Sequence, residues 1–103
     1  MVGCISRLFG GSATGSGDTH DDPISCKFTK EAVFYLEITA ITGSLDIELQ
    51  TQNVTTGTWH KLATWTTMNA IGNDEGFIDY GLGEMLAIKY NGTATFTVDV
   101  VLK

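Results

Sequence analysis

The chain has 103 residues, enough for one compact domain that buries about 65% of the surface of its unfolded chain. Its 6 basic and 12 acidic residues give a formal net charge of −6. This charge argues against binding to nucleic acid or to an anionic membrane surface, since both need a basic patch. Charged residues make up only 17% of the chain, and threonine fills many polar positions instead, which favours β-strands.

Residues 1–22 are predicted to form a flexible N-terminal arm. Residues 10–22 have the glycine- and serine-rich composition of a flexible linker. The apolar head in front of this linker is too short for a signal peptide or a membrane span, and also too short to hold a helix alone in water. We therefore expect the arm either to be disordered or to order against a partner, through Val2, Ile5, Leu8 and Phe9.

From Pro23 onward the chain is dense in predicted strands. Two stretches alternate apolar and polar residues on either side of a glycine, one around Gly43 and one around Gly92, and this pattern is typical of half-buried β-hairpins. No segment past residue 24 has a helical period. The predicted strands cover residues 24–29, 32–42, 45–52, 58–66, 76–80, 85–91 and 93–102.

Two irregular places interrupt these strands. Met68–Glu75 is the least patterned stretch and is predicted to be a long loop. Trp59 and Leu62 are three residues apart, so a β-bulge at His60–Lys61 is expected if both point inward. The sequence thus predicts an all-β fold, a single antiparallel β-sandwich over residues 23–103 of the jelly-roll or Greek-key type.

The two cysteines, Cys4 and Cys26, allow either a disulfide that ties the arm to the sandwich or two free thiols. Because no secretory signal precedes them, two free thiols are the favoured interpretation.

Two clusters of acidic residues have the chemistry of metal ligands. The first lies in the linker and comprises Asp18, His20, Asp21 and Asp22. It has no surrounding groups to orient its side chains, so a solvated acidic linker is the favoured interpretation. The second has no calcium-loop spacing and comprises Asp74, Glu75, Asp79 and Glu84. We expect no metal and no other cofactor.

No catalytic residue is expected. His60 is the one histidine of the predicted sandwich, and no nucleophile motif, paired-carboxylate signature, P-loop or dinucleotide fingerprint accompanies it. Among the aromatic residues, Trp59, Phe34 and Phe96 occupy apolar positions of the alternating pattern, and these three are predicted to lie in the core. Trp65 lies near a strand end and is the ring predicted to be available for stacking on a sugar or a partner.

Three segments, residues 45–52, 58–65 and 86–98, resemble a broad group of small virion proteins of tailed bacteriophages. The shared pattern is a strand ending in Gln-Thr, a turn, a Trp-x-x-Leu segment, and a Lys-aromatic strand followed by a glycine turn and a threonine-rich last strand. The resemblance covers about residues 32–103 and omits the arm. In the turn before Trp59, the chain has Val54-Thr55-Thr56-Gly57 where the group usually has Asp-Gly.

The resemblance implies a non-enzymatic capsid decoration, or cement, protein that stabilises a phage-like head. Such a protein would bind the major capsid protein on the outer surface of the virion, form a homo-oligomer with a trimer favoured, and be made in the host cytoplasm. The alternative is a carbohydrate-binding β-sandwich module on a host-recognition appendage, with exposed aromatic rings as its platform. Neither function involves nucleic acid or a membrane.

Overall fold

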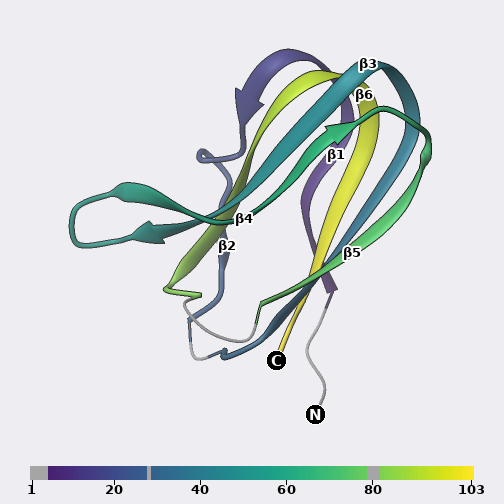
Figure 1. Cartoon of the computed structure of the whole chain (residues 1–103). Coiled ribbons are helices and arrows are strands. Elements are labelled where there is room, and N and C mark those ends of the chain that lie inside the picture. The colour runs from purple at the N-terminus through teal and green to yellow at the C-terminus, as the bar shows by residue number, and fades with distance from the viewer. Residues whose placement is uncertain (1–4, 28, 79–81) are drawn as a thin grey trace.

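The structure is a computed structural model that describes residues 5–27, 29–78 and 82–103. These residues form six strands (Figure 1): β1 (Ile5–Asp18), β2 (Ile24–Ser25), β3 (Ala32–Asn53), β4 (Thr58–Met68), β5 (Gly72–Ile78) and β6 (Met85–Leu102). All pairings are antiparallel, in the order β1-β6-β3-β4, with β2 also beside β6 and β5 beside β3. Within the described part of the chain, no helix is long and apolar enough to cross a membrane.

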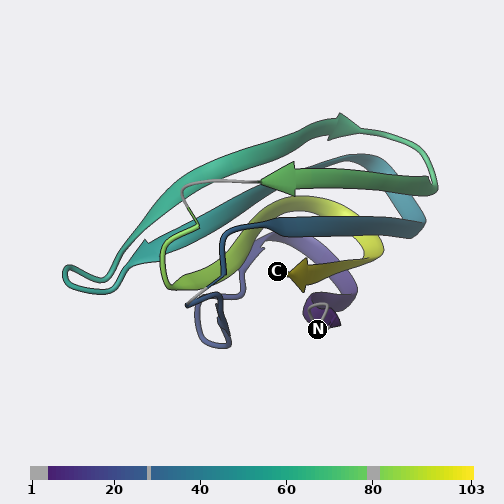
Figure 2. The same ribbon diagram turned by 90° about the horizontal axis from the view of Figure 1, so that it is seen from below.

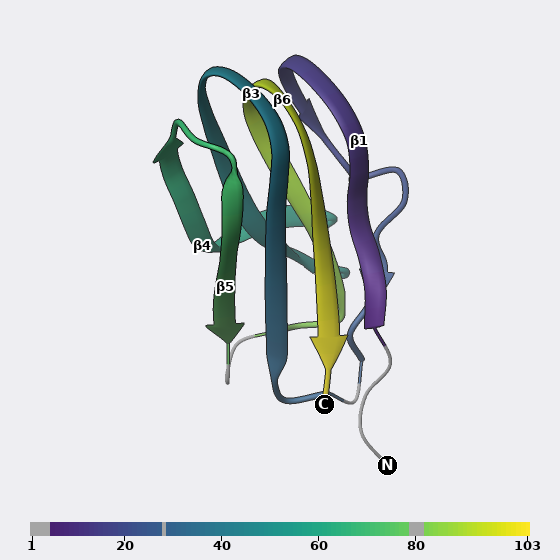
Figure 3. The ribbon, with the colours of Figure 1, turned by 90° about the vertical axis from the view of Figure 1, so that its right-hand side faces the viewer.

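The three longest strands bend midway, so that their two halves lie in different layers (Figures 1 and 3). One layer, called sheet A, contains residues 72–78, 32–42, 93–102 and 5–14 in this order. The other, sheet B, contains residues 58–68, 45–53, 85–92 and 15–18, with β2 beside residues 85–86. The molecule measures 37 × 31 × 19 Å, and its short dimension fits two layers about 10 Å apart. The predicted antiparallel β-sandwich is confirmed.

The two predicted hairpins are wrong, because the chain does not reverse at Gly43 or Gly92 but continues into the other layer. The pairing of β3 with β6 continues on both sides of this corner, with a register shift between Thr42 and Leu45. Gly43 and Gly92 have φ angles of 75° and 146°, which favour glycine. A Cβ on Gly92 would lie 2.4 Å from the carbonyl oxygen of Ser44, so β6 passes β3 too closely there for any side chain.

The core lies between the two sheets and receives side chains from both. Phe34, Phe96 and Val98 in sheet A, and Ile47 and Ile88 in sheet B, have at most 1% of their surface exposed. Burial of such a side chain stabilises the fold by roughly 1.5–3 kcal/mol. Phe34 and Phe96 are core residues, as predicted.

Aromatic rings close the two margins of the sandwich (Figure 2 shows β4 and β5 at one margin and β1 at the other). At the β1 margin, Tyr90 packs beside Phe9 and covers Gly17, where a Cβ would lie 2.3 Å from the tyrosine hydroxyl. At the other margin, Trp65 pairs with buried Ile47 and packs half-buried against the core, with its ring 3.4 Å from where a Cβ on Gly76 would lie. The availability of Trp65 for stacking on a sugar or a partner stays a prediction, for a ring that is partly covered by the core.

The prediction of a flexible arm over residues 1–22 is wrong for residues 5–18. They form β1, which pairs with β6 from Ile5 opposite Val101 to Asp18 opposite Lys89. Backbone hydrogen bonds of a ladder do not require large side chains, so a Gly/Ser-rich strand forms once its neighbour is in place. Leu8 is buried, Phe9 packs on the core, Ile5 is exposed, and Val2 and Cys4 lie outside the described residues.

Two other boundaries differ from the prediction. The loop expected over Met68–Glu75 is shorter, because β4 extends to Met68 and β5 begins at Gly72. The strand expected over residues 24–29 shrinks to the two residues of β2.

The correction to the arm can be tested by truncating a side chain of β1. We expect Leu8→Ala to lower the free energy of unfolding by about 2–5 kcal/mol, because removing this buried side chain leaves a cavity beneath β1. Ile5→Ala in the same strand is the control and should cost less than about 0.5 kcal/mol, since Ile5 is 63% exposed. Urea denaturation at low protein concentration measures the free energy of unfolding of both variants. If both lose the same small amount, residues 5–18 do not pack on the sandwich and the flexible arm is the better description.

Candidate functional site: the outer face of sheet B

The outer face of sheet B is predominantly polar because the second half of β3 alternates strictly. Ile47 and Leu49 point into the core, so Glu48, Gln50 and Gln52 point outward. The register places Lys89 beside Glu48 on one side and Thr64 on the other. We call this surface the B face; its residues are Ser16, Asp18, His20, Asp46, Glu48, Gln50, Gln52, Trp59, Lys61, Thr64, Thr66, Lys89 and Asn91.

A groove of about 410 Å³ lies on one end of the B face. Four strands contribute to its walls, and the polar side chains that line it are Ser16, Asp46, Glu48, Thr64, Thr66, Lys89 and Asn91. Two cross-strand contacts fix the rim: Ser16 donates to Asn91 Oδ1 at 3.1 Å, and the backbone N–H of Thr67 donates to Asp46 Oδ1 at 2.6 Å. The groove therefore presents carboxylate, ammonium, amide and hydroxyl groups, and hydrogen bonds hold those of Ser16, Asp46 and Asn91 in place.

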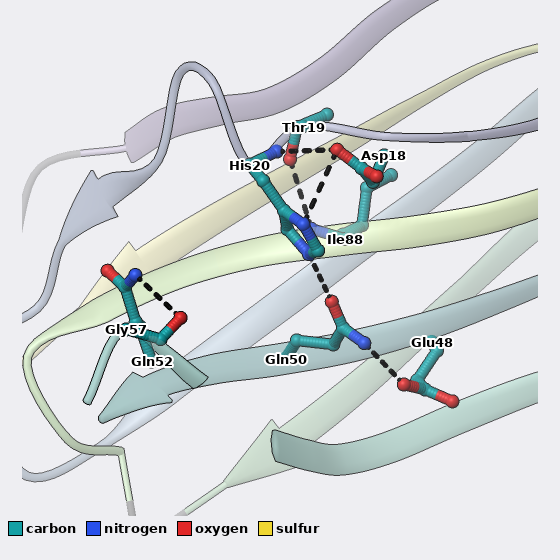
Figure 4. A network of polar contacts seen from close by, with 8 residues as sticks. All are labelled: Asp18, Thr19, His20, Glu48, Gln50, Gln52, Gly57 and Ile88. Atoms are coloured by element: carbon teal, nitrogen blue, oxygen red, sulfur yellow. Dashed lines mark hydrogen bonds and ion pairs between the residues drawn. The ribbon is translucent and has the colours of Figure 1, made fainter. Parts of the chain in front are cut away.

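A chain of polar contacts runs beside the groove (Figure 4). Gln50 Nε2 donates to Glu48 Oε2 at 2.5 Å, and Gln50 Oε1 faces His20 Nε2 at 2.5 Å. A carboxylate only accepts, so the amide nitrogen of Gln50 must face Glu48, and His20 Nε2 must carry the hydrogen that Gln50 Oε1 accepts. His20 Nδ1 lies 3.5 Å from Asp18 Oδ1. Glu48 is thus tied to the loop after β1.

This chain satisfies a glutamine that is almost fully buried. Gln50 has 6% of its surface exposed, and the described residues include no buried side-chain nitrogen or oxygen without a hydrogen-bond partner. The loop that carries His20 is itself fixed, because Thr19 exchanges hydrogen bonds of 3.0 Å with the backbone of Ile88. His20 is therefore held in place over Gln50 and covers part of the B face.

His20 stacks on Trp59, with ring centroids 4.4 Å apart and an interplanar angle of 3°. Trp59 pairs with Gln52 and lies on the B face, half-buried, so its prediction as a core residue is wrong. The reason is the bulge: it occurs opposite Leu49 and Gln50, with Leu62 as the extra residue, one position after the predicted His60–Lys61. The extra residue reverses the phase of the strand before it.

The other candidates of the sequence do not assemble into a site. Among the described residues, no group of three or more His, Cys, Asp or Glu side chains is placed to hold a metal ion. Asp18 and His20 belong to the chain of contacts above, and Asp79 lies outside the described residues. His60 is exposed on β4.

Cys26 is a free thiol that is fully buried, and its sulfur donates to the carbonyl oxygen of Leu82 at 3.4 Å. Burial raises the pKa of this thiol from 9.0 to about 11. Because the thiolate is the nucleophilic form, Cys26 is inert at neutral pH and its role is structural.

Comparison with known proteins shows the fold. No family model matches the sequence, and no curated protein sequence matches it significantly. The mitogen from Yersinia pseudotuberculosis is similar in structure at a TM-score of 0.58 and 14% identity, over 98% of this chain and 87% of that one. A carbohydrate-binding module of Cellvibrio mixtus lichenase 5A, in complex with cellotriose, is similar at a TM-score of 0.56 and 8% identity, over 100% of this chain and 98% of that one.

A protein derived from a prophage is also similar. YomS, from the SPBc2 prophage, matches at a TM-score of 0.54 and 13% identity, over 97% of this chain and 92% of that one. The chain is therefore a small β-sandwich protein whose structural neighbours include carbohydrate-binding modules and a phage-derived protein.

The stack on Trp59 can be tested with the two histidines of the chain. We expect His20→Ala to expose one face of Trp59 to water and shift its fluorescence emission to longer wavelength. We also expect it to cost about 1–3 kcal/mol, because the Gln50 carbonyl oxygen loses its donor. His60→Ala, next to Trp59 but exposed, should leave both quantities nearly unchanged. Spectra recorded in a Trp65→Phe background isolate the signal of Trp59, and identical spectra for the two variants would contradict the stack.

The raised pKa of Cys26 predicts a loss of stability in alkali. The folded state holds the thiol proton more tightly than the unfolded chain, so folding is unaffected below pH 9 and weakens as the pH rises from 9 to about 11. The loss at pH 11 is about 2 kcal/mol. Urea denaturation at each pH should show the free energy of unfolding falling more steeply in the wild type than in Cys26→Ala. The other groups that titrate in this pH range are present in both proteins, so the difference between them reports Cys26 alone. Parallel curves for the two proteins would show that the thiol does not titrate there.

Proposed function

We propose that the protein is a non-enzymatic carbohydrate-binding module and that the groove on the B face holds the sugar. The observation that carries this proposal is the groove itself: about 410 Å³ of open space lined by polar side chains from four strands of one rigid sheet. Ligand sites of small molecules are concave and carry a few polar groups at fixed positions. The B face supplies both properties.

The chemistry of the groove suits sugar hydroxyls, which both donate and accept hydrogen bonds. Asp46 and Glu48 accept, Lys89 donates, and Asn91 and Thr64 can do both. Lys89 has Glu48 and Asp18 as its cross-strand neighbours, so carboxylates on the same face offset its positive charge. Acidic groups outnumber basic ones there, which favours a neutral sugar over an anionic one.

The ring pair extends the site along the face. Trp59 lies opposite Gln52, further along β3 than Glu48 and on the same outer side. A half-exposed indole offers apolar surface for the C–H face of a sugar ring. An oligosaccharide is therefore a better match than a single sugar, with hydroxyls in the groove and one ring near Trp59.

The structural comparisons support the proposal by analogy of fold alone. The Cellvibrio mixtus module of the same fold was solved with cellotriose. The likeness to a prophage-derived protein and the sequence resemblance to phage virion proteins favour a host-recognition appendage as the place where this module acts.

A second candidate function is capsid decoration, in which the protein would bind the major capsid protein on a phage-like head and stabilise it. The resemblance of residues 45–52, 58–65 and 86–98 to small virion proteins favours it. An exposed apolar surface on sheet A, with Ile5 and Phe77 more than half exposed, could serve a protein partner.

Glycan arrays followed by titration calorimetry test the primary proposal. We expect a neutral oligosaccharide to bind, and Lys89→Ala and Glu48→Gln each to weaken binding at least about tenfold, the size of one lost charged hydrogen bond. Lys30→Ala and Glu37→Gln are the matched controls, since both residues are exposed away from the B face.

Two results would overturn carbohydrate binding at this groove. One is a blank array while purified phage-like capsid shells sediment with the protein, which would favour capsid decoration. The other is a bound glycan whose affinity is the same in Lys89→Ala and Glu48→Gln as in the controls.

A further inference from the structure

The outer face of sheet A carries a continuous apolar row. Val33 pairs with Phe77 on one side and with Val101 on the other, and Val101 pairs with Ile5. The row thus crosses all four strands of the sheet in the order β5, β3, β6, β1. Phe77 is 57% exposed and Ile5 is 63% exposed. Exposed apolar side chains that are contiguous, rather than scattered, mark interaction surfaces.

A second row of outward-facing residues lies two positions along the same strands. The register sets Tyr35 between Glu75 and Asp99, and Asp99 beside Arg7. Arg7 bonds Asp99 through Nε at 2.9 Å and through a terminal nitrogen at 3.3 Å. An arginine has five N–H donors, so Arg7 keeps donors for a further acceptor. Tyr35 is 40% exposed.

The two rows together complement themselves. Consider two copies packed through this face, related by a two-fold axis that lies between them and runs parallel to the strands. This axis places β5 of one copy over β1 of the partner, and β3 over β6 of the partner. Phe77 then lies over Ile5 of the partner subunit, and Val33 lies over the partner's Val101. In the second row, Glu75 lies over the partner's Arg7, and Tyr35 over the partner's Asp99. Every apolar side chain meets an apolar one, and every acidic group meets a donor.

We infer that sheet A is the interface of a homodimer in which two copies pack face to face about this axis. Stacked sheets pack with their strands within about 30° of each other, which keeps these pairs within reach of long side chains. Four strands about 4.8 Å apart and some seven residues long give a face of roughly 19 × 23 Å. That is small for a permanent complex, so the dimer is reversible, with a Kd between about 1 μM and 1 mM.

This inference does not depend on carbohydrate binding, which uses the opposite face. It replaces the trimer expected from the sequence resemblance with a dimer, and it leaves the two B faces directed away from each other.

A pair of charge reversals tests the register as well as the dimer. Arg7→Glu sets a new carboxylate against the partner's Glu75, and Glu75→Arg sets a new guanidinium against the partner's Arg7. Because like charges then face each other, each variant alone should raise the Kd of dimerisation at least tenfold. Mixed in equal amounts, the two variants form only opposite-charge pairs and should dimerise again. Sedimentation velocity over a concentration series measures this, with mass rising from 11.1 kDa toward twice that value in the wild type.

Phe77→Ser should also abolish dimerisation without unfolding the chain, since Phe77 is exposed, and circular dichroism checks the fold of every variant. Lys61→Glu makes the same change of charge as Arg7→Glu but on the B face, and should dimerise like the wild type. The inference is overturned if the wild type stays monomeric up to about 1 mM, or if it forms a trimer. It is equally overturned if the variants dimerise unchanged, or if the mixture stays monomeric.

Discussion

The close passage of β6 over β3 at Gly92 is the constraint on which the other features of the sandwich depend. A Cβ there would lie 2.4 Å from the Ser44 carbonyl oxygen and 2.9 Å from Leu45 Cα. Because Gly92 has none, the two central strands stay paired on both sides of the corner and bend together from one sheet into the other. This continuous pairing sets which residues are opposite one another in both sheets. The rows on each outer face, and hence both proposed binding surfaces, follow from it.

Much of the core could be predicted from the sequence, because period-2 alternation identifies the buried side of a strand. The alternation of Ile47 and Leu49 with Glu48 and Gln50 also identified which side of β3 would face solvent. What the pattern does not contain is the direction of the chain after a glycine. A hairpin and a corner both interrupt the alternation with a flexible residue, and only the pairing of β3 with β6 distinguishes them.

The errors at β1 and at Trp59 have the same cause, which is that a distant partner decides the outcome. β1 consists mainly of small and polar residues, so it has no local strand signal; its ladder with β6 and the burial of Leu8 hold it in place. Trp59 lies on the outer face and not in the core, because a single extra residue, Leu62, reverses the alternation of β4. The sequence indicates a solvated linker around His20, whereas the stacking of His20 on Trp59 joins residues 39 positions apart. No pattern within either segment indicates that contact.

The buried Gln50 explains how a flat sheet surface can hold polar groups at fixed positions. Burying an amide costs free energy unless its donors and acceptors are paired, and here Glu48 and His20 pair them. The same two hydrogen bonds restrict the Glu48 carboxylate at the wall of the groove and hold the loop after β1 on the sheet. A side chain that is already ordered loses less entropy when a ligand binds. An apolar residue at position 50 could fill the same space, but it would leave Glu48 and His20 free to move. The glutamine therefore links the stability of sheet B to the order of its outer face, and this is the physical reason to place the binding site there.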